Sequence, residues 1–142
     1  MQKITPFLWF DGRLEEAVSF YTSVFKNARV ENVSARSAAF TIEGQEFMAF
    51  NGGPHFKFNE AVSFFVRCGT QAEVDYFWDR LREGGGTESR CGWLKDRFGL
   101  SWQVIPDALG RYLADTDRAK ADRVMQAMLK MRKIDIAALD AA

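Results

Sequence analysis

The sequence of 142 residues predicts an α+β fold made of two copies of one strand–helix–strand unit, followed by a helical tail. The first observation is an internal repeat: residues 17–21 resemble residues 73–77, and residues 44–50 resemble residues 99–105 at nearly the same spacing. The second is that an apolar strand, an amphipathic helix and short β-type runs follow each other twice. The third is that the remaining C-terminal segment shows only helical spacing.

The first module, at about residues 1–52, begins with a strand at Ile4–Phe10, which is apolar on both faces. Asp11 can cap the helix that follows, in which apolar residues recur at helical spacing between Leu14 and Phe25. Short runs of β-forming residues complete the module, at Val30–Val33, Ser37–Ile42 and Glu46–Phe50. A linker at 51–59, which contains Gly52-Gly53-Pro54, leads to the second module.

The second module, at about residues 60–106, repeats this order. Its first strand is predicted at Ala61–Arg67, and Thr70 with Glu73 forms a T-x-x-E capping box for the next helix. That helix ends before the glycines at 84–86. The pattern then indicates a hairpin around Phe98-Gly99, with strands at Trp93–Arg97 and Ser101–Ile105.

The tail, residues 107–142, carries a helix from Thr116 onward. Its apolar stripe consists of Val124, Met125, Met128 and Leu129. Such a stripe must be buried, either against its own domain or against a partner. We therefore expect a homodimer, with packing of the tail on its own chain as the alternative.

Composition excludes several classes of protein. Nineteen basic and nineteen acidic residues give zero net charge, without the basic stripe of a nucleic-acid-binding protein. Every apolar run is far shorter than the ~20 residues of a membrane-spanning helix, and no signal peptide is visible. Two cysteines, Cys68 and Cys91, fit neither a disulfide framework nor a zinc motif. We expect a cytoplasmic protein that binds neither nucleic acid nor membrane.

Three strings in the sequence resemble the PhnB-like, or "3-demethylubiquinone-9 3-methyltransferase-like", branch of the vicinal oxygen chelate superfamily, which includes glyoxalase I and bleomycin-resistance proteins. They are Phe50–Asn59, Cys91–Gln103 and Ala127–Ala137. The resemblance implies two βαβββ modules that form a curved mixed sheet around a concave pocket (the glyoxalase/bleomycin-resistance fold), usually in dimers. Methyl transfer is not supported by the residues, because the glycines at 84–86 end a helix instead of following a strand and opening one.

The superfamily's metal ligands come from the first and last strands of each module. The resemblance carries those positions onto Ile4 or Thr5, Met48, Ala61 and Gln103, and among these only Gln103 is a usual ligand type. A usable zinc or iron site needs at least three such side chains. We therefore expect no metal and no other cofactor, with a divalent metal as the less favoured possibility.

No catalytic residue can be assigned. The candidate ligand pocket comprises seven residues: Trp9, Met48, Phe50, His55, Ser63, Trp93 and Gln103. His55, the single histidine, is either a general base or a side chain that hydrogen-bonds its loop. Gln103 should share a face with Ser101 and Ile105, and is either a polar pocket contact or a buried, satisfied amide. Most aromatic residues, including Phe47, Phe64 and Trp102, are expected in the core.

Three functions are consistent with these observations. The favoured one is a metal-free protein that binds an unidentified small molecule, partly aromatic or apolar. The second is a divalent-metal-dependent enzyme of the superfamily (a lyase, isomerase, dioxygenase or thiol transferase), whose ligands would include His55, Glu46 or Glu60. The third is a dimeric interaction module without a ligand.

Overall fold

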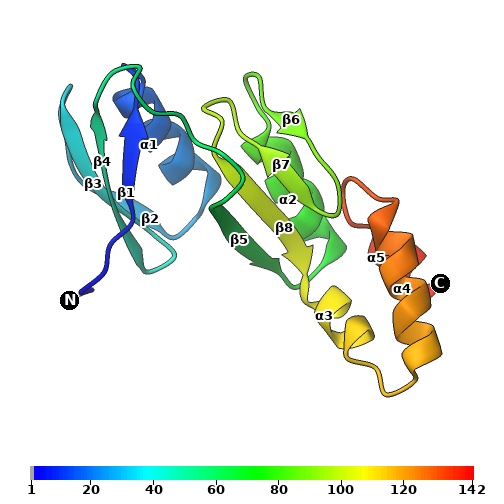
Figure 1. Cartoon of the computed structure of the whole chain (residues 1–142). Helices are drawn as coiled ribbons and strands as arrows, with labels where there is room; N and C mark the ends of the chain where they lie inside the picture. The colour runs from blue at the N-terminus through cyan, green and yellow to red at the C-terminus, as the bar shows by residue number, and fades with distance from the viewer. Residues whose placement is uncertain (1) are drawn as a thin grey trace. The chain divides into compact units, whose positions relative to one another are not determined.

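The computed structural model describes residues 2–142 and divides the chain into two compact units. The first unit ends at Phe58 and the second extends from Asn59 to Ala142, so the division falls inside the predicted linker. Each unit contains one four-stranded mixed sheet with a helix on it, which confirms the predicted α+β fold (Figure 1). The C-terminal tail is helical and belongs to the second unit.

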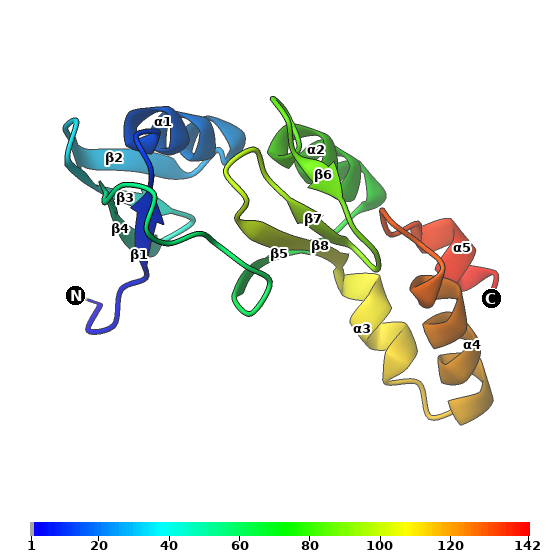
Figure 2. The ribbon, with the colours of Figure 1, turned by 45° about the horizontal axis from the view of Figure 1, so that its top comes forward.

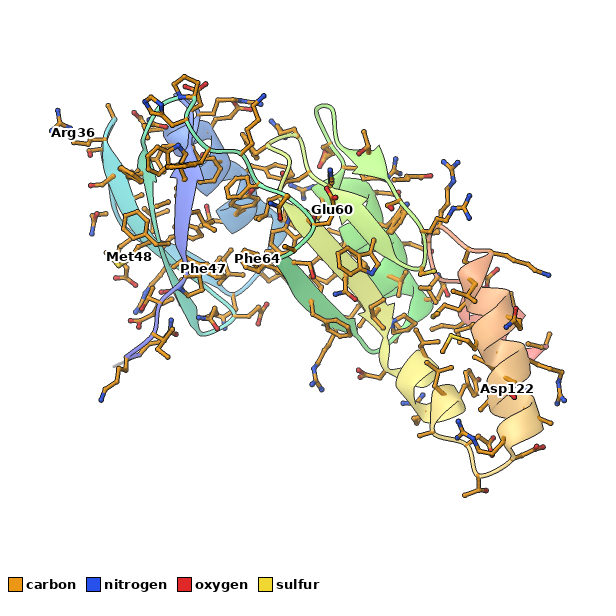
Figure 3. The ribbon with its side chains drawn as sticks, in the orientation of Figure 1. Arg36, Phe47, Met48, Glu60, Phe64 and Asp122 are labelled. Carbon is orange, nitrogen blue, oxygen red and sulfur yellow. The ribbon has the colours of Figure 1, made fainter. Side chains whose placement is uncertain are left out.

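The first unit places its sheet against a single helix. The elements are β1 (Phe7–Phe10), α1 (Leu14–Val24), β2 (Ala28–Val33), β3 (Ser37–Ile42) and β4 (Gln45–Asn51). The sheet has the order β1-β4-β3-β2, in which β1 and β4 are parallel and the other pairs antiparallel. Helix α1 covers one face (Figures 1 and 2). Strand alternation therefore buries Phe47 and leaves its neighbour Met48 exposed on the other face (both labelled in Figure 3).

Helix α1 begins differently from the prediction. Arg13 occupies the N-cap position, and Asp11, the expected cap, makes no cap bond. Instead, the backbone N–H of Leu14 donates to Asn51 Oδ1 at 3.1 Å. The Asn51 amide also donates to the carbonyl of Ala35 at 2.8 Å. The end of β4 thus supplies the cap across the fold, which a local pattern cannot reveal.

The second unit repeats the arrangement with a shorter edge strand. Its elements are β5 (Ser63–Cys68), α2 (Gln71–Leu81), β6 (Thr87–Glu88), β7 (Trp93–Lys95) and β8 (Ser101–Pro106). The sheet has the order β5-β8-β7-β6, with β5 and β8 parallel. Asp96 forms the predicted turn between β7 and β8, and it is buried: its carboxylate accepts from the N–H groups of Phe98 and Leu100 and from Nε1 of Trp102.

The capping box of α2 is present with one shift. Thr70 Oγ1 accepts from the N–H of Glu73 at 3.2 Å, as predicted. Glu73 Oε1, however, accepts from the N–H of Gly69 at 3.0 Å, one residue before the cap. One orphan donor of the helix, the N–H of Glu73, is therefore satisfied, while the return bond goes to the residue before the cap.

The tail forms three helices, α3 (Asp107–Leu113), α4 (Arg118–Leu129) and α5 (Ile136–Asp140), where the sequence predicted one. They pack together at the end of β8 (Figure 2). Their own core consists of Leu109, Val124, Ile134 and Leu139, with Ile105 of β8 and Met128 packed against it. The predicted stripe is thus covered in part by its own chain: Val124 and Met128 face inward, whereas Met125 and Leu129 stay exposed.

Polar contacts anchor the tail to the rest of the second unit. The Gln71 amide donates to the carbonyl of Ile134 at 3.0 Å and accepts from the N–H of Ile136 at 2.8 Å. The N–H groups of Cys91 and Gly92 donate to the carbonyls of residues 131 and 132, both at 2.8 Å. Among the helices of residues 2–142, none has the length and apolar character needed to cross a membrane.

Candidate functional site

The open face of the first sheet, opposite α1, is apolar and aromatic. In β1 and β4 the register sets Phe7 beside Met48 and Trp9 beside Phe50. Phe7 is 54% exposed and Met48 is 44% exposed, while Trp9 and Phe50 are half-buried. Three of the predicted pocket residues, Trp9, Met48 and Phe50, therefore lie together on one surface.

Trp9 is held in place on this face from several directions. Its indole Nε1 donates to the carbonyl of Gly53 at 2.9 Å. The rings of Phe50 and Phe56 meet it edge-on, with centroids 4.7 and 4.8 Å away. Gly52 passes so close that a Cβ there would lie 2.4 Å from the indole. The glycine-rich loop after β4 therefore fixes an aromatic ring that remains half-exposed, which is a common element of small-molecule sites.

The open face of the second sheet, opposite α2, carries polar groups. Ser63, Ser101 and Gln103 lie on it, and Gln103 Nε2 donates to Ser63 Oγ at 2.9 Å. Trp93 of β7 is paired with Gln103. The predicted residues Ser63, Trp93 and Gln103 therefore also lie together, and Gln103 shares its face with Ser101 and Ile105 as expected from strand alternation.

One polar atom on this face has no partner. Ser101 is 1% exposed, and its hydroxyl oxygen is the single buried side-chain N or O atom in the described part of the chain without a hydrogen bond. Its neighbours across the sheet are Lys95 on β7 and Ser63 on β5. Lys95 forms an ion pair with Glu60, and the ammonium group lowers the pKa of that carboxylate.

His55 is exposed and has no hydrogen-bond partner among residues 2–142, so its imidazole does not tie the linker together as one interpretation expected. Cys68 is fully buried, and burial raises the pKa of its thiol to about 12, with contributions from Glu73 and Asp107. A neutral thiol is a poor nucleophile. Neither His55, which has no partner among the described residues to orient it, nor Cys68, whose thiol stays neutral, therefore belongs to a pair of nucleophile and base.

The positions expected for metal ligands need correction. Ile4, Thr5 and Ala61 all lie before the strands to which they were assigned. On the open faces the corresponding strands present Phe7, Met48, Ser63 and Gln103, of which Gln103 is still the one common ligand type. Within residues 2–142, no three His, Cys, Asp or Glu side chains are grouped in a way that could hold a metal ion.

Sequence reasoning missed several residues of these faces. Phe7, Phe56 and Phe65 are 54%, 65% and 55% exposed, although phenylalanine suggests a core position. Phe47 and Trp102 are buried as expected, and Phe64 is half-buried with its ring edge-on to Trp102 at 5.3 Å. The alternation of residues along β1 and β5 was the signal that could have separated the exposed aromatic residues from the buried ones.

Comparisons with known proteins agree on the fold. The sequence model of a family described as 3-demethylubiquinone-9 3-methyltransferase matches residues 2–105. The solved structure of a PhnB protein from Bacillus cereus is 35% identical, with a TM-score of 0.68, and the match covers 74% of this chain and 99% of that one. None of the curated proteins matches.

Two more distant structures share the fold. The fosfomycin resistance protein FosX from Mesorhizobium loti is 16% identical with a TM-score of 0.58, over 80% of this chain and 99% of that one. A glyoxalase-related enzyme from Fulvimarina pelagi is 15% identical with a TM-score of 0.58, over 77% and 91%. At this level of identity the likeness concerns the fold and not the chemistry.

Proposed function

Because this chain belongs to the PhnB-like family described as 3-demethylubiquinone-9 3-methyltransferase, within the glyoxalase/bleomycin-resistance superfamily, we propose that it binds a small molecule on an open sheet face. The proposed ligand is partly aromatic or apolar, and the proposed binding requires no resident metal. The family description names a methyl transfer, but the glycines at 84–86 follow α2 and do not open a helix after a strand. A Rossmann-type cofactor loop requires glycines that follow a strand and open a helix.

The observation that carries the proposal is the exposed aromatic surface around Trp9. An open sheet face in a protein without a ligand is normally polar, because exposed apolar area is unfavourable in water. Here Phe7, Met48 and Phe56 are each more than 40% exposed beside the fixed indole. Such a surface is stabilised when an apolar or aromatic molecule covers it.

The proposal is tested by thermal melting of the full chain with a panel of small aromatic and aliphatic metabolites. A ligand that binds only the native state raises the melting temperature. Met48→Gln should abolish the shift, whereas Val33→Gln, a change at a similarly exposed position (45% against 44%) on the edge strand β2, should preserve it. A panel that produces no shift would favour the interaction module without a ligand.

Metal analysis of the purified protein separates the proposal from the enzyme alternative. We expect less than about a tenth of an equivalent of zinc, iron, nickel or manganese, because Gln103 is the one common ligand type at the mapped strand positions. Stoichiometric metal that survives dialysis and is lost in Gln103→Ala would instead support a metal-dependent enzyme.

A further inference from the structure

We propose that the open face of the second sheet recognises the carboxylate group of a small molecule, and that Glu60 occupies this place until the small molecule displaces it. The inference rests on the proposed function, because it names the chemical class of the small molecule. It depends on four side chains of one unit: Lys95 and Ser101 would bind the carboxylate, Glu60 is the internal competitor, and Trp93 lies beside them.

Three neighbouring strands and the turn before β5 position the side chains of the proposed site. Strand β8 lies between β5 and β7, and the register places Lys95, Ser101 and Ser63 in one row across the three strands. Glu60 precedes β5, on the far side of β8 from Lys95. The ion pair between Lys95 and Glu60 therefore joins β7 to the turn before β5, two segments on opposite sides of β8 (Glu60 is labelled in Figure 3).

The buried hydroxyl of Ser101 is the proposed hydrogen-bond donor to the carboxylate. A buried polar group without a hydrogen bond is rare in folded proteins and calls for a reason. The Ser101 hydroxyl can donate one hydrogen bond, and Lys95, the cationic residue of its row, is its register partner on β7, although the ammonium group makes no hydrogen bond to the hydroxyl. A hydroxyl donor beside a cation is an arrangement that suits an anionic oxygen, and such charge-assisted bonds are the stronger ones.

The carboxylate of Glu60 can leave the ammonium group of Lys95 at little cost in stability. Its side chain is 60% exposed and that of Lys95 is 42% exposed, and ion pairs of this kind contribute little to stability. Glu60 lies in a turn and not in a strand, so that its movement leaves the sheet intact. A ligand carboxylate can therefore take over the ammonium group of Lys95 and in addition satisfy Ser101, which Glu60 leaves unsatisfied.

The neighbouring row of the sheet defines the rest of the ligand. Phe65, Gln103 and Trp93 lie side by side, one pleat further along β8. One ammonium group balances a single negative charge, which favours a monoanionic carboxylate over a doubly charged phosphate. The ligand class that fits both rows is a small aromatic monocarboxylate.

The test uses the full chain and two probes of nearly equal shape, benzoate and the neutral benzamide, with inorganic phosphate as a third. Binding is followed by NMR titration, with the backbone amides of Lys95 and Ser101 as local reporters. We expect the wild-type protein to prefer benzoate. Glu60→Gln should bind benzoate about tenfold more tightly, and Lys95→Met about tenfold more weakly, which corresponds to one charge-assisted contact. Benzamide binding should be the same in all variants.

Glu31→Gln is the matched control, because Glu31 forms an exposed ion pair with Arg29 at 2.6 Å on the first sheet. It should leave benzoate binding unchanged. Equal benzoate affinity in Glu60→Gln and Glu31→Gln, or an unchanged affinity in Lys95→Met, would overturn the carboxylate assignment. A stronger response to phosphate than to benzoate would also overturn it. If Lys95→Met has a markedly lower melting temperature than the wild type, Lys95→Gln takes its place in the titration.

These outcomes separate the inference from the proposed function. If Glu60→Gln and Lys95→Met leave the benzoate affinity unchanged while benzamide still binds, the carboxylate site is refuted and small-molecule binding stands. Benzoate binding that depends on Lys95, together with a melting shift from the metabolite panel that Met48→Gln leaves unchanged, would support the carboxylate site and contradict the role proposed for the aromatic face of the first sheet.

Discussion

The indole of Trp9 occupies the space that a side chain at position 52 would need. A Cβ on Gly52 would lie 2.4 Å from two atoms of the Trp9 ring, and the next residue, Gly53, accepts the indole hydrogen bond. The loop after β4 and the aromatic face of the sheet are therefore one structure, because the loop can follow its path only where it carries no side chain.

Gly52→Ala should accordingly destabilise the protein, because either the loop or the indole has to move. We expect a loss of about 1–3 kcal/mol, the usual cost of overpacking, in urea denaturation followed by tryptophan fluorescence. Gly110→Ala is the control: it lies in α3 with no atom within 4 Å of the added Cβ, and it should be neutral or stabilising. Equal stability of the two variants would show that Trp9 moves aside freely.

Ser101→Ala should stabilise the protein in the absence of ligand. The substitution removes a buried hydroxyl that has no partner, and an unsatisfied buried group costs about 1–3 kcal/mol. Chemical denaturation without ligand should therefore show a higher midpoint. A lower midpoint would mean that the hydroxyl is satisfied in solution, for instance by a bound water molecule.

Gln71→Ala should loosen the tail. The Gln71 amide makes two hydrogen bonds at the start of α5, to the carbonyl of Ile134 and the N–H of Ile136, and each contributes about 1 kcal/mol. We expect the free energy of unfolding to fall by about 2 kcal/mol. Hydrogen exchange at the Ile136 amide should become faster, because this N–H loses its acceptor. Gln126→Ala, at an exposed position of α4, should change neither quantity.

Cys68 should make stability fall with pH in the alkaline range. Its ordinary pKa of 9.0 is raised to about 12 in the folded protein, so above pH 9 the unfolded thiol loses its proton while the folded one keeps it. The free energy of unfolding should therefore decrease between pH 9 and 12 by up to about 1.4 kcal/mol per pH unit, with no effect below pH 9. Cys68→Ala should show a shallower pH dependence than both the wild type and Cys91→Ala. Three parallel curves would contradict the raised pKa.

The homodimer expected from the sequence stays a prediction. Met125 and Leu129 lie one turn apart on α4 and are 38% and 46% exposed, whereas Met128 packs in the core of the tail. Light scattering should give twice the 16.2 kDa of one chain. Met125→Asp combined with Leu129→Asp should produce a folded monomer, since neither carboxylate would enter the core. A wild-type mass near that of one chain refutes the dimer, and a dimeric variant places the interface elsewhere.

Local patterns predicted the elements of the fold well where the decisive contacts are close in sequence. The strand Ser37–Ile42 has the predicted bounds, because a tight turn at Glu43-Gly44 ends it. The capping box at Thr70 was also found from four consecutive residues. Strand β1, in contrast, begins at Phe7 and not at Ile4, since its first register partner is Met48, far along the chain.

The same distinction applies to the candidate site. The seven expected pocket residues were chosen by type and by resemblance, and alternation along each strand placed six of them on the open faces. Glu60 and Lys95 could not be paired in advance, because ion pairs between distant residues leave no periodic signal in a single sequence. The lack of a partner at Ser101 depends on every neighbouring atom and is visible only in three dimensions.

The close contact at Gly92 joins the second sheet to the tail. A Cβ at Gly92 would lie 2.6 Å from Ile105 and 3.1 Å from Ile134, and its N–H is bound by the tail, which lies outside the part that the family's sequence model matches. Deleting the tail would therefore uncover Gly92 and leave the N–H groups of Cys91 and Gly92 without their acceptors. The tail is therefore not a removable appendage, because a chain shortened to residues 1–105 would lose packing around Ile105 and hydrogen bonds in the second unit.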